Sequence, residues 1–271
     1  MRLGLIKIDE KEAGLALILE SGILGNALHA FVLDRGPLWF GGFGIASHSR
    51  LFFEQINRQF PRRLGRRRRI IPELNDNEET QNIMKSLGYR RMYGPGYETI
   101  WLDLGQSPEE LMADMNQNWR RNLKKAKELG LKVVWDSEGQ YSPWFLKVHG
   151  LDKAKRGYDG PEPDIVKALT EKFAAEGDIL LGRAMLNDKA VAAMLILCHG
   201  HAATYQAGWS GKEGRTAGAH HLLFFEAFSA LKEKGIRDFD LGGVNDKKAA
   251  GVKKFKLGSG GKLVKLAGHY T

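Results

Sequence analysis

The stretch ILLGRAMLNDKAVAAMLILCHGHAATYQAG, residues 179–208, decides the fold class of this chain. Its three apolar, strand-like runs are residues 179–186, 190–198 and 201–208. Only Asn187-Asp188-Lys189 and Gly200 separate these runs, and both are turn-forming sequences. Short apolar runs with such brief separations predict an antiparallel meander of three strands.

Outside the meander, helices alternate with strands. Four times a helical pattern ends at a glycine and a strand-like run follows. The expected helices are residues 77–87, 107–129, 164–176 and 218–234, and the strands after them are 89–93, 131–135, 178–186 and 236–241. Glycine is favoured there because it accepts the left-handed conformation that ends many helices. The alternation predicts an α/β protein with mixed sheets.

The helix expected at 107–129 has the clearest pattern. Ser107, Pro108 and Glu110 provide a capping box with proline in the first turn. An apolar stripe runs through Leu111, Met115, Trp119, Leu123 and Ala126. The other side of the helix carries cations, including Arg120, Arg121 and Lys124. These cations form either a charged, solvent-facing side or a site for an anionic ligand.

The first hundred residues repeat this organisation less regularly. The expected strands are residues 14–20, 27–33, 38–40, 66–71 and 98–104, and a helix is expected at 47–60. This order suggests a diverged second copy of the same kind of domain. We therefore predict a first domain at residues 1–104 and a second at 105–271, packed without a flexible linker.

The charge of the chain favours an anionic partner. Its 271 residues include 41 Lys and Arg against 32 Asp and Glu, a net charge of +9. Such a balance suits nucleic acid, a phosphorylated substrate or an anionic membrane surface. The densest run of arginines lies at residues 62–69, and Arg66, Arg67, Arg68 and Arg69 are candidates for phosphate contact. The alternative is an edge strand whose charged side chains face water.

Several classes of site are excluded or disfavoured. The one cysteine, Cys198, allows no intrachain disulfide and no cysteine metal site, and its apolar run predicts a buried thiol. The histidines lack metal-ligand spacing, so we expect no metal and no cofactor; His220 and His221 are candidates for a general base. Hydrolase, NTPase and dehydrogenase motifs are absent from the sequence. Without a signal sequence or an apolar run long enough to span a bilayer, we expect a soluble, cytoplasmic protein.

Glycines and lysines near the end of the chain form a further candidate site. Gly242 and Gly243 follow the strand expected at 236–241, and a cluster Lys253-Lys254-Phe255-Lys256 comes shortly after. Glycine turns after strands bring backbone N–H groups close to ligands. The alternative is a glycine-rich surface loop.

Taken in order, a set of short motifs resembles the FemABX family, the aminoacyl-tRNA-dependent transferases of peptidoglycan cross-bridge synthesis. The motifs are Arg35-Gly36-Pro37, Leu87-Gly88-Tyr89, Trp119-Arg120-Arg121-Asn122-Leu123-Lys124-Lys125-Ala126, Tyr205-Gln206-Ala207-Gly208, Asp240-Leu241-Gly242-Gly243, Phe255-Lys256 and Gly268-His269-Tyr270. The meander, helix and strand of the second half also resemble the core of the GNAT acyltransferase fold.

The resemblance implies two tandem GNAT-like domains. The first is shortened, because the chain begins late compared with the family. It implies transfer of an amino acid from aminoacyl-tRNA to an amine of a nucleotide- or lipid-linked peptidoglycan precursor. A membrane surface, contacted peripherally, is a further expected partner. Phe255 and Lys256 match the acyl-transfer centre. Tyr205 and either Arg120 or Arg121 match positions that bind the precursor's phosphates and sugar.

The remaining candidate residues follow from the chemistry of amine attack on an ester. Lys256 would stabilise the oxyanion, and Asp240 or a substrate carboxylate would accept the amine's proton. Lys124, Gly242 and Gly243 are expected to bind substrate, and the run Arg66–Arg69 to bind tRNA.

Two other functions remain open. One is an acyl-CoA-dependent GNAT transferase that uses residues 215–220 as a pyrophosphate loop. There His220 stands where a small residue is required. The other is a non-catalytic RNA-binding protein that uses the arginine run.

Overall fold

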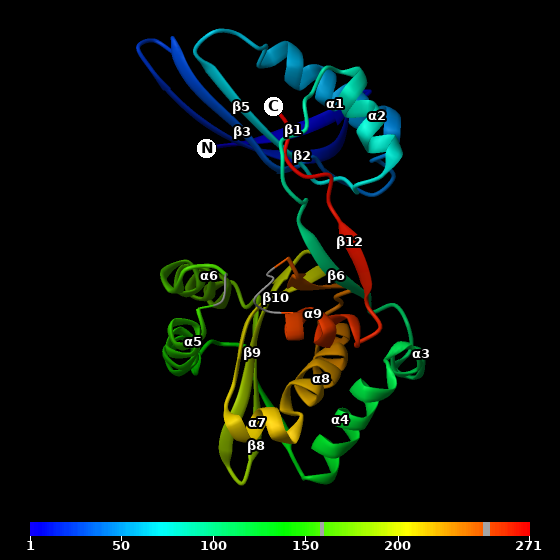
Figure 1. The fold of residues 1–271 in the computed structure, drawn as a ribbon, viewed down its shortest axis with the longest axis vertical. Coiled ribbons are helices and arrows are strands. Elements are labelled where there is room, and N and C mark those ends of the chain that lie inside the picture. Colours follow the sequence, from blue (N-terminus) through cyan, green and yellow to red (C-terminus); the bar gives the residue numbers. More distant parts are fainter. Residues whose placement is uncertain (158–159, 246–249) are drawn as a thin grey trace. The chain divides into compact units, whose positions relative to one another are not determined.

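The computed structural model describes residues 1–157, 160–245 and 250–271. The chain divides into two compact units, Met1–Glu98 with Val264–Thr271, and Thr99–Leu263. Each unit has its own mixed sheet with helices packed on it, which confirms the α/β class (Figure 1). The domain boundary after residue 104 stays a prediction. In the division into two compact units, residues 99–103 already belong to the second sheet.

The sheet of the first unit has the order β1-β2-β3-β5, with β4 beside β2. Its strands are β1 (Arg2–Ile8), β2 (Lys11–Ile23), β3 (Leu28–Gly36), β4 (Leu38–Trp39) and β5 (Arg66–Pro72). Phe31, Leu33 and Ile70 on one face are buried against residues of α1 (Ala46–Gln59) and α2 (Glu78–Ser86). The strand β1 was not expected from the sequence.

The prediction of a strand at residues 89–93 is wrong. Tyr89 instead closes the end of α2, because its N–H donates to Met84 O at 2.9 Å. After it, only an isolated bridge joins Arg91 to Tyr270 among the described residues. The available partner is a short segment near residue 270, so no longer ladder forms.

The second unit contains a seven-stranded sheet in the order β12-β6-β11-β10-β9-β8-β7. Its strands are β6 (Glu98–Asp103), β7 (Lys132–Asp136), β8 (Ile179–Leu186), β9 (Lys189–His199), β10 (Ala202–Ser210), β11 (Asp238–Gly243) and β12 (Lys262–Lys265). The predicted meander is confirmed, because β8, β9 and β10 pair antiparallel in sequence order. The strand β11 returns parallel to β10.

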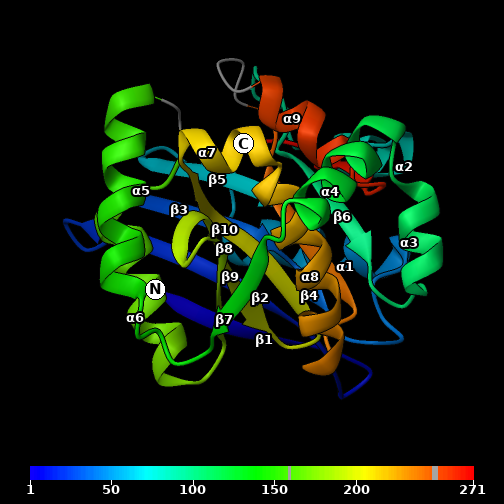
Figure 2. The same cartoon turned by 90° about the horizontal axis from the view of Figure 1, so that it is seen from below.

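Helices cover both faces of this sheet (Figure 2). On one face lie α5 (Ser142–Arg156) and α6 (Pro163–Ala175), whose Phe145 and Val166 are buried against the odd-numbered residues of β8. On the other face lie α4 (Gln117–Glu128) and α8 (Ala219–Glu233). The helices α5 and α9 (Ala250–Leu257) were not expected from the sequence.

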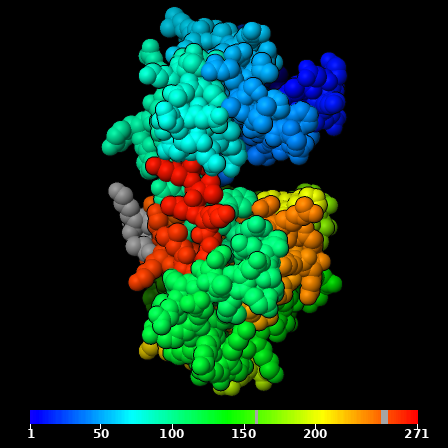
Figure 3. Space-filling view, turned by 90° about the vertical axis from the view of Figure 1, so that its right-hand side faces the viewer, coloured from blue at the N-terminus to red at the C-terminus, as the bar shows by residue number. Residues whose placement is uncertain are grey.

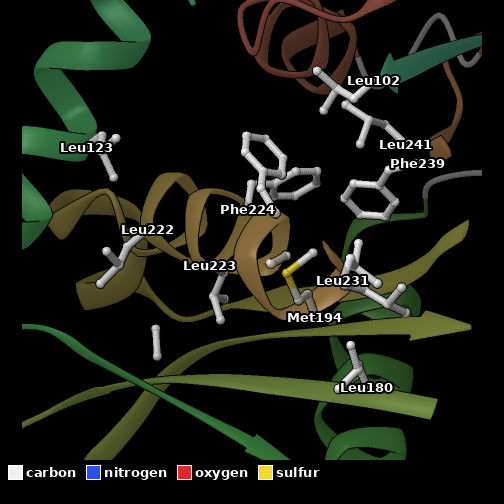
Figure 4. Close-up of a cluster of buried hydrophobic side chains, with 14 of the residues drawn as sticks. Leu102, Leu123, Leu180, Met194, Leu222, Leu223, Phe224, Leu231, Phe239 and Leu241 are labelled. Atoms are coloured by element: carbon white, nitrogen blue, oxygen red, sulfur yellow. The ribbon is translucent and has the colours of Figure 1, made fainter. Parts of the chain in front are cut away.

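The main core lies between α8 and the sheet. Leu223, Phe224 and Leu231 of α8 point toward Met194 and Phe239 on the strands (Figure 4). Each of these side chains is fully buried. Burying one large apolar side chain contributes roughly 1.5–3 kcal/mol, so these five side chains together make a large contribution to the stability of the second unit.

The single helix expected at 107–129 is wrong, because two helices occupy the region, α3 (Pro108–Asp114) and α4. The capping box is present: Ser107 Oγ accepts from Glu110 N at 3.2 Å, and Glu110 Oε2 accepts from Ser107 N at 2.8 Å. The break falls at Met115, whose ψ is 139°. A second cap begins α4, because Asn116 Oδ1 accepts from Trp119 N at 2.8 Å. The apolar stripe is nevertheless buried throughout.

The helix expected at 218–234 is likewise preceded by a separate one, α7 (Lys212–Ala217). Gly218 joins α7 to α8 with a φ of 73°, a conformation that glycine adopts readily. In the described part of the chain, none of the helices combines the length and apolar character needed to cross a membrane.

We predict that Asn116→Ala destabilises the second unit by about 1 kcal/mol, because the first turn of α4 loses its side-chain cap. Urea unfolding followed by circular dichroism measures this change. Gln117→Ala, one residue further along the same turn, is the matched control and should unfold as the wild type does. Equal unfolding of the two variants would contradict the assignment of Asn116 as the cap.

Candidate active site

The site is organised by a short pairing between β10 and β11. The two strands pair in parallel only from Ala202 to Thr204, opposite Asp238 to Asp240. Beyond these residues the ladder of β10 with β9 shifts register between Tyr205 and Ala207, and the ladder of β11 with β6 shifts between Asp240 and Gly243. The two strands thus stop pairing just where the predicted substrate-binding residues begin.

Lys256 reaches this point from α9. Its Nζ donates to Gly242 O at 3.2 Å and to Gly243 O at 3.1 Å. The same Nζ lies 5.4 Å from the centroid of the Tyr205 ring. The structure therefore brings together five predicted residues, which we call the Lys256 cluster: Lys256, Asp240, Tyr205, Gly242 and Gly243.

Asp240 holds Gly242 and Gly243 at the end of β11, where the pairing with β6 is irregular, and we call this bend the glycine turn. Its Oδ1 accepts from Gly242 N at 2.8 Å and from the hydroxyl of Thr99 on β6. Gly242 has a φ of 74°, and a Cβ there would lie 3.0 Å from Tyr205 O. The turn therefore requires glycine at this position, and the Asp240 carboxylate holds the turn through its hydrogen bond from Gly242 N.

Burial within the cluster makes the Lys256 ammonium more acidic than that of an ordinary lysine. Burial lowers the pKa of Lys256 to about 8, while the charge of Asp240 opposes this change. Only 5% of the Lys256 surface is exposed, so the charged form has lost most of its hydration. At neutral pH the ammonium is still mostly protonated, close to a carboxylate that stabilises it.

His220 and Phe255 form the aromatic surroundings of the cluster. The ring of Phe224 lies 5.0 Å from that of Tyr205 and 5.1 Å from that of Phe255. A Cβ on Gly208 would collide with the Tyr205 hydroxyl and lie 2.9 Å from His220 Nε2, so both polar atoms flank this glycine. Burial lowers the pKa of His220 to about 4, so its imidazole is neutral at pH 7.

The cations predicted to bind substrate lie on the surface of α4. Arg120, Arg121 and Lys124 line a hollow of about 430 Å³, together with Gln117 and Asn118. Asn118 also lines a second hollow of about 260 Å³, to which Trp119, Lys254 and Phe255 contribute. In Figure 3 the orange-red surface of α9 borders the green surface of α4. The two hollows thus share Asn118, and the second is lined by Phe255, the chain neighbour of the buried Lys256.

The arginine run lies in the other compact unit, on the edge strand β5. Arg67 and Arg69 point outward and are exposed. Arg68 points inward with 6% exposure, and it donates to Asn57 Oδ1 at 2.7 Å and Phe60 O at 3.1 Å. Arg66 is partly buried and donates to His29 Nδ1 at 3.1 Å. The prediction that Arg68 contacts tRNA is therefore corrected, because strand alternation turns its side chain into the core.

Thr99 is a residue that sequence reasoning missed, and His220 is one that it named only together with His221. Thr99 lies in β6, and no local sequence pattern predicts that this strand pairs with β11. His220 was one of two histidines at the start of a helix, and nothing distinguished it from His221. Among the residues that the structure describes, no group of His, Cys, Asp or Glu side chains is arranged to hold a metal ion.

Comparison with known proteins identifies the family. The model of the acetyltransferase (GNAT) domain matches residues 113–257, more than half of the chain. The chain belongs to the GNAT acetyltransferase family. Among curated proteins, no sequence matches it significantly.

Solved structures show the same fold in distant relatives. FemX is 14% identical with a TM-score of 0.77, and the match covers 99% of this chain and 87% of FemX. The C-terminal domain of a putative lysylphosphatidylglycerol synthetase from Agrobacterium fabrum is 14% identical with a TM-score of 0.57, covering 95% and 80%. A tandem GNAT protein from the clavulanic acid biosynthesis pathway is 11% identical with a TM-score of 0.52, covering 98% and 80%. These likenesses confirm the predicted FemABX-like fold with tandem GNAT-like domains.

The lowered pKa of Lys256 predicts a specific dependence of stability on pH. Between about pH 8 and the unfolded lysine value of 10.5, the folded state binds fewer protons than the unfolded state. The contribution of Lys256 to the unfolding free energy therefore rises with pH across this window. We expect the stability of the wild type relative to Lys256→Met to rise by about 1–3 kcal/mol from pH 8 to pH 10.5 in urea unfolding.

The matched control is Lys262→Met, which removes an exposed lysine of the same unit. Its stability relative to the wild type should stay constant over this pH range. A constant difference for Lys256→Met as well would show that Lys256 titrates as an ordinary surface lysine.

Proposed function

We propose that this GNAT-family transferase moves an amino acid from aminoacyl-tRNA to an amine of a peptidoglycan precursor. The observation that carries the proposal is the buried ammonium of Lys256, held at the point where β10 and β11 stop pairing. The FemX-like fold over nearly the whole chain supports the same function. The precursor is nucleotide-linked or lipid-linked, and both forms present phosphates to the protein.

The reaction requires an oxyanion to be stabilised. The amine nitrogen attacks the carbonyl carbon of the aminoacyl ester, a C–N bond forms and the C–O bond to the ribose breaks. The amine loses a proton and the ribose oxygen gains one. In the tetrahedral intermediate the carbonyl oxygen carries negative charge, and a preorganised donor there contributes roughly 3 kcal/mol. In our proposal the Lys256 ammonium is that donor.

The surrounding residues have supporting roles. Asp240 Oδ1 already accepts two hydrogen bonds, so we assign Asp240 to positioning the turn and keeping Lys256 charged. The Gly242 and Gly243 carbonyls orient the ammonium. Burial lowers the pKa of His220 to about 4, so its imidazole is a weak base that lines the site beside Gly208, and a carboxylate of the substrate is our candidate to accept the proton of the attacking amine.

The hollow on α4 suits the acceptor's phosphates. Arg120, Arg121 and Lys124 supply cations, and Gln117 and Asn118 add amide groups that hydrogen-bond sugar hydroxyls. Guanidinium groups bind phosphate oxygens through paired, charge-assisted hydrogen bonds. Its link through Asn118 to the hollow beside Phe255 supports one continuous binding surface for the precursor.

The start of α8 favours aminoacyl-tRNA over acyl-CoA as donor. Acyl-CoA enzymes of this fold bind pyrophosphate at the corresponding helix N-terminus. Here α4 packs against that turn: a Cβ on Gly218 would lie 2.7 Å from Asn122 O. The His221 ring also contacts Trp119 of α4, with centroids 5.0 Å apart. The N–H groups of this turn are thus less accessible to a pyrophosphate.

We predict that Lys256→Met lowers turnover at least about tenfold, because the oxyanion loses its cation. Methionine keeps the apolar length of the side chain, so the fold should persist, as checked by circular dichroism. Transfer of label from aminoacyl-tRNA to precursor measures turnover. Lys262→Met is the control with unchanged turnover, and unchanged turnover in Lys256→Met would remove Lys256 from the catalytic assignment.

A second prediction concerns the outward arginines of β5. If Arg67 and Arg69 bind tRNA, the double variant Arg67→Gln/Arg69→Gln should weaken tRNA binding and reduce the salt slope by about one for each lost contact. Fluorescence anisotropy of labelled tRNA at several salt concentrations measures both changes. An unaltered slope would make these arginines a solvated strand edge.

A further inference from the structure

One end of the first unit's sheet presents large apolar side chains to water. Leu64 is 99% exposed, Leu24 77%, Ile23 61% and Leu28 50%. Ile23 ends β2, Leu24 lies in the turn that follows, Leu28 begins β3, and Leu64 comes from the loop before β5 (Figure 1). We call these four residues the apolar tip. Side chains exposed to this extent contribute little to the core, so folding alone does not explain them.

The two loops of the tip are tied to one another. Arg63 Nη1 donates to Ala27 O at 3.1 Å, and Nη2 donates to Asn26 O. His29 N donates to Gly65 O at 2.8 Å. A Cβ on Gly65 would collide with Ala27 O, so this close approach requires glycine. These hydrogen bonds thus hold both loops, and the apolar residues that they carry, at the same end of the sheet.

The backbone at Leu24 gives a second, independent observation. Leu24 has a φ of 52°, in the left-handed region that disfavours residues with a branched or bulky side chain. Asn26 and Gly25, the next residues of the turn, are types that accept this conformation readily. A leucine at this position costs stability and remains exposed, which points to a use outside the folded unit.

The charge around the tip complements an anionic surface. Arg62, Arg63 and Arg67 are exposed, and the two segments 21–29 and 61–69 contain no Asp or Glu. Within the described ranges, none of these three guanidinium groups forms an ion pair with an Asp or Glu side chain, and Arg62 donates to Thr271 O. Apolar side chains surrounded by arginines match the boundary of an anionic bilayer, where leucines enter the acyl region and arginines lie among the phosphates.

We propose that the apolar tip docks the protein onto an anionic membrane surface. Ile23, Leu24 and Leu64 enter the interface, while Arg62 and Arg63 bind lipid phosphates. An RNA partner fits these residues less well, because RNA is bound through phosphate contacts and base stacking on aromatic rings, and the four apolar residues of the tip are aliphatic. The proposal does not depend on the acyl-transfer reaction.

The test is vesicle co-sedimentation of the full chain. The wild type should bind vesicles of equal parts phosphatidylglycerol and phosphatidylcholine, and bind phosphatidylcholine alone much less. The double variant Leu24→Asn/Leu64→Ser should weaken binding to the anionic vesicles about tenfold or more, because two apolar side chains no longer enter the bilayer. Its thermal unfolding should be unchanged or slightly higher, since asparagine relieves the strain at position 24.

The matched control is Leu151→Ser, which removes another exposed leucine, on α5 of the second unit. It should bind vesicles as the wild type does. Absence of vesicle binding by the wild type, or equal binding by the tip variant, would overturn the proposal. Loss of tRNA binding in the tip variant, measured by anisotropy, would also overturn it in favour of an RNA surface. Transfer to a soluble, nucleotide-linked acceptor should be unaffected, which separates this test from that of the catalytic function.

Discussion

The short parallel pairing between β10 and β11 is the constraint on which the second unit depends. Three residues of each strand hold the meander and the returning strand in one sheet, and beyond them the two strands stop pairing. The core between α8 and the sheet fixes this pairing from one side, through Phe224 and Phe239. Because the pairing stops at Tyr205 and Leu241, backbone carbonyls of the glycine turn remain for Lys256 to bind. The fold thereby creates the site without any dedicated loop.

Electrostatics decide what this arrangement can do. A buried lysine loses hydration, which lowers its pKa to about 8, and a buried carboxylate two residues before Gly242 limits the change. The outcome is a cation that stays charged at neutral pH but is poorly hydrated, and such a cation stabilises developing negative charge more strongly than a surface lysine does. On α4, by contrast, Arg120 and Arg121 are hydrated and exposed, which suits reversible binding of phosphates.

The sequence predicted the architecture well where hydrophobic periodicity is strong, and failed where one side chain or a distant partner decides. The meander and the buried stripe from Leu111 to Ala126 follow directly from spacing. The break at Met115 is followed by a new helix start that depends on one cap hydrogen bond accepted by Asn116, which periodicity cannot detect. The burial of Arg68 depends on which alternate residues of β5 face the helices, and four consecutive arginines carry no such signal. Phe255 and Lys256 were named through family resemblance, whereas the contact of Asp240 with Thr99 joins residues far apart in the chain.

The identity of the acyl donor is the central claim, and one competition experiment tests it most directly. Purified protein is incubated with a pool of radiolabelled aminoacyl-tRNAs and a nucleotide-linked muropeptide precursor, with labelled acetyl-CoA as the donor in a parallel reaction. Our account predicts that label moves from tRNA to the precursor while acetyl-CoA is left unused. Consumption of acetyl-CoA with the label remaining on tRNA would contradict it, and would make the protein an acyl-CoA-dependent member of the GNAT family.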